Sequence, residues 1–207
     1  MFFHIMPLDK LLLFIGAELV FSLTPGPTVM MISAHGFHGG WRAALAAICG
    51  TQTGNTLWYL VCVLGLGAMV AASPLAFRVI AFAGAAYLVW LGASALWHSR
   101  APAEGTQAPR PRGRPFVQAV LTQLGNPKAL LFFGALLPGC LTMSLPLGPQ
   151  YAVMYAVTFI GESVILCGYA WLAVAGGRMA AAHHAVWRER VSGAVLIGLG
   201  VLFAAHA

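Results

Sequence analysis

Long apolar segments, separated by short polar or basic loops, dominate the hydropathy pattern of this chain. They cover residues 8–33, 41–70, 75–97, 116–141, 150–177 and 191–206. All but the last, which is slightly shorter, reach the ~20 residues that a helix needs to span a bilayer. Strand-like alternation of apolar and polar residues is not seen. Because backbone amides in lipid must bond within their own segment, the pattern predicts six membrane-spanning helices.

The composition agrees with a protein whose surroundings are lipid. Of the 207 residues, 60% are hydrophobic and 8% are charged, and the mean hydropathy is +0.84. Soluble domains carry about 25% charged residues, and one core of this size could not bury so much apolar surface. We therefore expect an all-α integral membrane protein. A cleaved signal peptide around residues 11–21 is a disfavoured alternative, because only Lys10, offset by Asp9, precedes it.

Basic residues gather on one side of the predicted membrane. The loops after the first, third and fifth segments hold Arg42, Arg100, Arg110, Arg112, Arg114, Arg178, Arg188 and Arg190. The other side holds Lys10 and Arg78. By the positive-inside rule, the basic loops face the cytoplasm and both termini lie outside. The net charge of +6 therefore indicates topology, and we expect no nucleic-acid partner.

A stretch rich in proline and arginine, HSRAPAEGTQAPRPRGRP at 98–115, divides the chain into two halves. Its composition is typical of a flexible cytoplasmic linker, and a patch for anionic lipid or nucleic acid is the alternative. Residues 1–97 would form a first three-helix repeat and residues 116–207 a second. Because each repeat has an odd number of spans, the second must be inverted relative to the first, as in many secondary transporters.

The two halves share weak motifs in the same order. TPGPTVMM and LGNPKALLFF lie in their first helices, and TGNTLWYL and IGESVILC lie in their second helices. Each first helix is interrupted well inside its segment, at Pro25, Gly26 and Pro27 in one half and at Asn126 and Pro127 in the other. Proline removes an amide donor and clashes with the carbonyl one turn back. We therefore expect the first helix of each repeat to be broken.

Paired breaks of this kind predict a substrate site near the middle of the membrane. Irregular backbone persists at that depth only where protein or a water-filled cavity covers it. The amide end of a half-helix attracts carboxylates and the carbonyl end attracts cations, so two crossed broken helices suit a zwitterion such as an amino acid. A simple packing kink is the alternative at either break.

Charged residues inside the apolar segments are the next candidates. Glu18 lies seven residues before Pro25 on the same helix face, Glu162 lies well inside the fifth segment, and Lys128 directly follows the second break. A charge at this depth costs at least ~2.5 kcal/mol and usually marks a transport path or a proton relay. Lys128 could neutralise either carboxylate or hold the carboxylate of a substrate. A structural ion pair is the alternative.

Neutral polar residues form two faces that we expect to turn inward. The faces are Gln52, Asn55 and Tyr59 on the second helix and Gln118, Thr122 and Asn126 on the fourth. They either line the path or join helices, and Asn55 and Asn126 are the better functional candidates. The full candidate set for substrate and protons is Glu18, Pro25, Gly26, Pro27, Asn55, Asn126, Pro127, Lys128 and Glu162.

Cysteines and histidines predict no further site. Cys49, Cys62, Cys140 and Cys167 stand alone in apolar segments without a C-x-x-C pair, so we expect no disulfide framework, metal site or cofactor. His35, His38, His183 and His184 are expected in solvated cytoplasmic loops, because companion ligands at metal spacing are absent.

TPGPTVMM, GGWRAALAAICGTQTGN, GAAYLVWLG and GNPKALLFF, in this order over nearly the whole chain, resemble the LysE/RhtB family of amino-acid exporters. The resemblance implies a small six-span protein of the bacterial inner membrane, not an enzyme, that exports amino acids or their derivatives by the proton motive force. The positions that match by motif are Pro25, Gly26, Pro27, Asn126, Pro127 and Lys128. Asn55 departs from the family, whose members commonly have an aspartate there. Asparagine cannot carry a proton, so Glu162, at the equivalent place in the second half, could take that role with Glu18.

Two other functions stay open. A membrane thiol-disulfide electron carrier would need a cysteine in each half, and the breaks hold none. A structural or assembly protein would need neither Glu162 nor Lys128. The expected partners are membrane lipid, a small zwitterionic solute and protons, and glycine-faced helices would allow a homodimer.

Overall fold

The computed structural model describes residues 5–72 and 113–176, together with the single positions 86, 89, 90, 93, 97, 194, 197, 198 and 201. Every regular element within these residues is helical. The third and sixth predicted segments, most of the predicted linker and the histidine pair at 183–184 lie outside the described stretches. The prediction of two inverted three-helix repeats can therefore be compared with the structure only for the first two segments of each half.

The first predicted segment is a helix broken in its middle. α1 (Leu8–Leu23) ends at Thr24, whose extended backbone (φ −74°, ψ 117°) stops the helix. α2 (Pro27–Ala72) begins at Pro27, where proline fits because the first turn of a helix needs no amide donor. The two helices are bent by 49° at this point. The predicted break at Pro25, Gly26 and Pro27 is confirmed.

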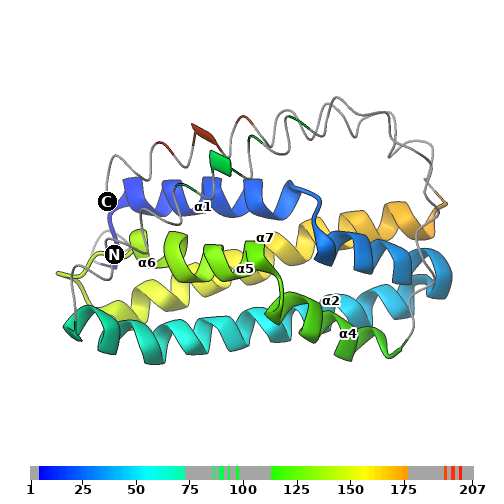
Figure 1. The fold of residues 1–207 in the computed structure, drawn as a ribbon, viewed down its shortest axis with the longest axis horizontal. Helices are drawn as coiled ribbons and strands as arrows, with labels where there is room; N and C mark the ends of the chain where they lie inside the picture. The colour runs from blue at the N-terminus through cyan, green and yellow to red at the C-terminus, as the bar shows by residue number, and fades with distance from the viewer. Residues whose placement is uncertain are drawn as a thin grey trace.

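α2 consists of two legs that join at Gly40. The backbone of Gly40 (φ 68°, ψ −166°) lies in a region that is essentially restricted to glycine. Figure 1 shows the chain running from the break to one end of the bundle, reversing there, and returning along the whole bundle. The second leg corresponds to the predicted segment 41–70.

The fourth predicted segment is broken in the same way. α4 (Pro115–Leu124) is followed by α5 (Pro127–Leu131), the π-helix η2 (Phe132–Leu136) and α6 (Leu137–Gly139). Asn126 caps α5, since its side-chain oxygen accepts a hydrogen bond from the Lys128 amide at 3.0 Å. The two parts are bent by 48°, which confirms the predicted break at Asn126 and Pro127. The fifth predicted segment is α7 (Leu147–Val174), a continuous helix.

Among the described residues, α7 alone is a single helix long and apolar enough to cross a bilayer. Each of the two broken pairs also qualifies when its parts are taken together, which gives up to three spans. This is fewer than the six predicted for the whole chain. Two predicted segments lie outside the described stretches, and the second leg of α2 is continuous with the first.

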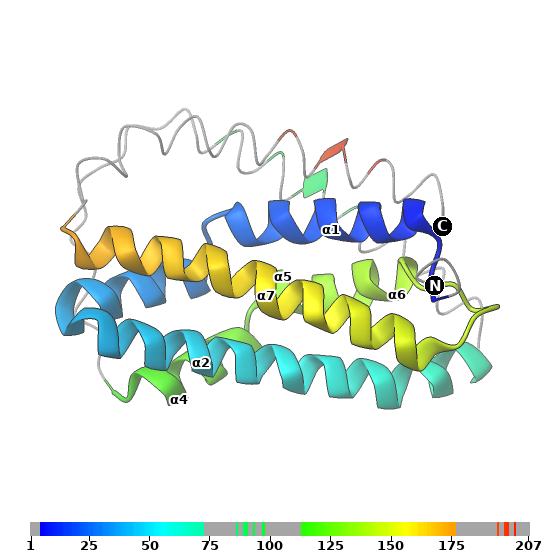
Figure 2. The same cartoon turned by 180° about the vertical axis from the view of Figure 1, so that it is seen from behind.

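The two broken helices lie side by side and run in opposite directions. Lys10, at the start of α1, donates a 3.0 Å hydrogen bond to the carbonyl of Leu141, just beyond α6. Nε2 of His35, in the first leg of α2, lies 2.9 Å from Oε1 of Gln118 in α4. Figures 1 and 2 show the same arrangement from opposite sides, with the start of α1 at the end of the bundle where α6 lies. The described parts of the two halves are thus antiparallel, as inverted repeats require.

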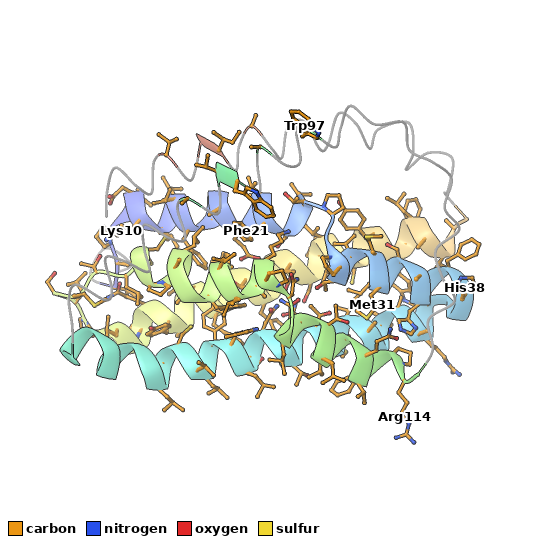
Figure 3. All side chains as sticks on the ribbon, in the orientation of Figure 1. Lys10, Phe21, Met31, His38, Trp97 and Arg114 are labelled. Carbon is orange, nitrogen blue, oxygen red and sulfur yellow. The ribbon has the colours of Figure 1, made fainter. Side chains whose placement is uncertain are left out.

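Basic residues of the described stretches lie at both ends of the bundle. Figure 3 places Lys10 at one end and both His38 and Arg114 at the other. Arg42 follows the turn at Gly40 and belongs to the same end as Arg114.

Glycines bring α2 and α4 into close contact. A Cβ atom on Gly50 would lie 2.2 Å from the carbonyl oxygen of Phe116, and one on Gly54 would lie 2.8 Å from Cβ of Gln123. No larger residue fits at these distances. The G-x-x-x-G spacing of α2 therefore sets how closely the two halves approach each other.

Apolar residues pack on both sides of the breaks. One cluster gathers aromatic side chains toward the α6 end of the bundle, among them Phe14, Phe21, Tyr59, Phe132 and Phe133. The other lies toward the Gly40 turn and includes Ile32, Ala44, Ala119, Leu166 and Ala170. The polar residues of the breaks are enclosed between these two clusters.

The expectation that His35 lies in a solvated loop is wrong. His35 is only 4% exposed. The reason is that the first leg of α2 continues past residue 33 to the turn at Gly40. Gln118 supplies the polar partner that a buried imidazole needs.

Candidate functional site

The two breaks face each other across a pocket in the middle of the bundle. The pocket holds about 500 Å³ of space free of protein atoms, part of it open to the surroundings. The predicted site residues that line it are Glu18, Gly26, Asn55, Asn126, Lys128 and Glu162. Pro25, Pro27 and Pro127 are not among the lining residues, and they shape the backbone of the breaks instead. The structure therefore brings the charged and amide candidates of both halves together.

One part of the pocket wall is apolar. It is made by Phe21, Val29, Ala129, Phe132, Phe133 and Leu166. The ring centroids of Phe21 and Phe132 are 5.3 Å apart, so α1 and η2 meet at this wall. A π-helical stretch inside a helix often marks a functional site, and here it presents Phe132 and Phe133 to the pocket.

Lys128 reaches from the second break to the first. Its ammonium donates to the carbonyl oxygens of Phe21 and Thr24, the latter at 2.9 Å, and lies 5.4 Å from the Phe21 ring centroid. These carbonyls are left free where α1 ends, and a cation is favourable at the C-terminal end of a helix. Lys128 thus caps α1 and bonds directly to neither carboxylate. Figure 3 shows Phe21 midway along the bundle, so this contact lies far from both ends.

Glu18 is held by hydroxyl groups. It is 3% exposed and accepts hydrogen bonds from Ser22 at 2.8 Å and from Thr158 at 3.2 Å. The Thr158 hydroxyl lies 2.9 Å from the hydroxyl of Tyr59. A carboxyl group in this setting keeps hydrogen-bond partners whether or not it carries a proton.

Glu162 is held by amide groups. One of its oxygens accepts hydrogen bonds from Asn55 and, at 3.3 Å, from Gln52. The expected inward face of the second helix is confirmed, because Gln52, Asn55 and Tyr59 are all buried. Asn55 therefore cannot itself be protonated and deprotonated, but it donates a hydrogen bond to the carboxyl group of Glu162, which can.

The pocket holds more acidic groups than basic groups. Glu18 and Glu162 bring two carboxyl groups, and Lys128 brings one ammonium group. Uncompensated charge is expensive in a membrane interior. The surplus carboxylate leaves room for a proton or for the ammonium group of a ligand. Within the described stretches, no cluster of three or more His, Cys, Asp or Glu side chains could hold a metal ion.

The expected inward face of the fourth helix is confirmed only in part. Asn126 is buried, and Gln118 joins α4 to buried His35 of α2, but Gln118 and Thr122 are only half-buried. The buried amide of α4 is Gln123. Within α4 the buried face is Ala119 and Gln123. Asn126 does not continue the face of Gln118 and Thr122, because α4 stops at Leu124 and the helix restarts at Pro127.

Several hydroxyl and amide residues of the pocket were not singled out from the sequence. They are Ser22, Thr24, Thr28, Gln123 and Thr158. A signal for two of them was present, because Ser22 follows Glu18 by four residues and Thr158 precedes Glu162 by four. Residues at this spacing share a helix face with Glu18 and with Glu162.

Sequence comparisons identify a protein family and several relatives that this chain resembles. The family model named LysE type translocator matches residues 19–207. An uncharacterized membrane protein of Vibrio cholerae is 34% identical over 196 residues, which cover 93% of this chain and 95% of the relative. A homoserine/homoserine lactone efflux protein of Salmonella typhimurium is 36% identical over 157 residues (73% and 74%). A leucine efflux protein of Salmonella choleraesuis is 25% identical over 181 residues (86% and 84%), and no solved structure matches.

Proposed function

Because the chain belongs to the LysE-type translocators, we propose that it exports an amino acid or a close derivative across the bacterial inner membrane. Relatives named for efflux of homoserine, its lactone and leucine support this substrate class. They also support a membrane transporter rather than an enzyme. Transport would run from the end that holds Arg42 and Arg114 to the end that holds Lys10.

The observation that carries the proposal is the pocket between the two breaks, with two carboxyl groups against one ammonium group. An amino acid and its lactone share an ammonium group, and Glu18 and Glu162 offer it two acceptors in a site with few other charges. A substrate carboxylate, where present, would lie toward the ammonium of Lys128. The apolar wall around Phe132 and Leu166 suits an aliphatic side chain.

Proton coupling is assigned to Glu162, with Glu18 as the second carboxyl group. A carboxyl group that gains or loses a proton changes the charge balance of the pocket, and with it the affinity for a substrate ammonium. The resemblance to the LysE/RhtB motif implies an aspartate at the position of Asn55. The bond of Asn55 to Glu162 suggests that the proton-carrying group has moved across the pocket to α7.

The substrate proposal is tested by removing one charge from the substrate at a time. Purified protein in proteoliposomes would exchange labelled leucine or homoserine against an unlabelled competitor. The competitors are leucine, its methyl ester without a carboxylate, and the hydroxy acid without an ammonium group. We expect the ester to compete weakly and the hydroxy acid not at all.

Variants then locate the recognition within the pocket. Lys128→Met should reduce the difference between leucine and its methyl ester, because the cation that meets the carboxylate is gone. Lys10→Met, at the end of the bundle, is the matched control and should preserve that difference. A hydroxy acid that competes as well as leucine would contradict the proposal. Exchange of no amino acid at all would favour a structural or assembly role.

A further inference from the structure

Five hydrogen bonds join the second helix break to Glu162 in one row. The Lys128 amide donates to Asn126 (3.0 Å), Asn126 to Thr28 (3.2 Å), Thr28 to Gln123 (2.8 Å), Gln123 to Asn55 (2.6 Å), and Asn55 to Glu162. The row contains Thr28 just after the first break and Asn126 at the second. It continues through α4 and α2 and ends on α7. One side-chain network therefore connects both breaks with the carboxyl group of Glu162.

Every bond in this row donates toward Glu162. An amide side chain has one accepting oxygen and one donating nitrogen, so the orientation of one amide sets that of the next. The backbone amide of Lys128 can only donate, which requires the oxygen of Asn126 to face it. That constraint passes through Thr28 and Gln123 to Asn55. Glu162 is consequently the terminal acceptor, the role that a carboxylate fills best.

A proton on Glu162 would weaken this arrangement at its last bond. Hydrogen bonds to an ionised carboxylate are roughly twice as strong as bonds between neutral groups. Bonds in a row polarise one another, so a weaker final bond also weakens those behind it. The bonds that hold Thr28 and Asn126 together across the two breaks would then loosen.

We propose that Thr28 and Gln123 are positioning residues that transmit the protonation state of Glu162 to the two helix breaks. The inference rests on the proposed function, because it assigns the coupling step of the same pocket. Coupling of this kind is reciprocal. If protonation of Glu162 alters the breaks, then cutting the row must alter how protons act on transport.

Other groups around Glu162 stay in place when the row is cut. The charged groups that face it are Glu18 from α1 and Lys128 from α5, and the phenol of Tyr59 lies on α2. Gln52 also donates to the same oxygen of Glu162 and accepts a 3.3 Å hydrogen bond from Asn55. The side chains of these four residues bond to neither Thr28 nor Gln123. A change at Thr28 or Gln123 therefore leaves the local charges of the pocket unaltered.

The test uses two variants that cut the row and two that do not. Thr28→Val and Gln123→Met remove the polar group and keep side-chain bulk. Thr28→Ser keeps the hydroxyl. Thr53→Val is the matched control, because the Thr53 hydroxyl is exposed and bonds only along its own helix, to the carbonyl of Cys49 at 2.9 Å. The readout is the pH midpoint of amino-acid exchange in proteoliposomes, which requires binding but no net proton flow.

Loss of one hydrogen bond in the row predicts a midpoint shift of roughly half a pH unit or more. The shift should be toward alkaline pH, since a carboxylate with weaker donors holds its proton more tightly. Thr28→Ser and Thr53→Val should both have the wild-type midpoint. Normal exchange with an unshifted midpoint in both Thr28→Val and Gln123→Met overturns the relay and leaves the export function standing. A wild-type protein that exchanges no amino acid overturns the function and the relay with it.

Discussion

The contact between α2 and α4 makes Gly50 the position where the smallest change should have a measurable structural effect. In Gly50→Ala the new Cβ would lie 2.2 Å from the carbonyl oxygen of Phe116 and 2.8 Å from Cβ of Ala119. The nearest atom belongs to the backbone and cannot rotate away. Ordinary van der Waals contact begins at 3.4 Å, so α4 would have to move away from α2 by roughly 1 Å.

Two opposing effects decide the size of the change. Overpacking of this kind costs about 1–3 kcal/mol, and replacing a helical glycine by alanine recovers up to about 1 kcal/mol. We expect a net loss of roughly 1–2 kcal/mol, which corresponds to a melting temperature lower by about 2–8 °C. The displacement would also lengthen the 2.6 Å bond from Gln123 to Asn55 and so slow export.

Thermal unfolding of the purified protein in detergent measures the effect. Gly65→Ala on the same helix is the matched control, because no described atom lies within 4 Å of its new Cβ. It should be as stable as the wild type or slightly more so. A Gly50→Ala protein as stable as the Gly65→Ala protein would refute the close approach of α2 and α4.

Two further predictions concern the second break and the cysteines. Asn126→Ala removes the cap of α5 and the bond to Thr28, so the protein should lose about 1 kcal/mol or more of stability, whereas Asn126→Asp keeps an accepting cap and should melt close to the wild type. Replacing all cysteines by serine leaves no thiol for electron transfer, and amino-acid export should persist. The positions replaced are Cys49, Cys62, Cys140 and Cys167, all of which are free thiols. Loss of export in a folded cysteine-free protein would revive the thiol-disulfide alternative.

The sequence was sufficient to locate both breaks and the charged residues around them. Proline acts on the helix in which it stands, so Pro25, Pro27 and Pro127 could be interpreted without knowing their neighbours. Depth in an apolar segment was likewise enough to select Glu18 and Glu162. The antiparallel course of the described helices was predictable from the parity of the spans alone.

Other features depend on how the two halves cross. Gln123 could not be selected, because its burial results from the break three residues later and from the space that Gly54 provides. The contact of Lys128 with the carbonyls of Phe21 and Thr24 requires the two breaks to lie opposite each other. His35 was misplaced because the sequence does not show that the helix continues to Gly40. The homodimer and the roles of lipid and protons stay predictions.

The most direct measurement is export driven by an imposed pH gradient, in proteoliposomes that hold either the wild type or Glu162→Gln. Glutamine keeps the size and the accepting oxygen of Glu162 but cannot exchange a proton. If Glu162 carries the coupling proton, the gradient accelerates leucine or homoserine export by the wild type, and Glu162→Gln exchanges substrate without responding to the gradient. A Glu162→Gln protein that responds to the gradient as the wild type does would contradict the coupling role of Glu162.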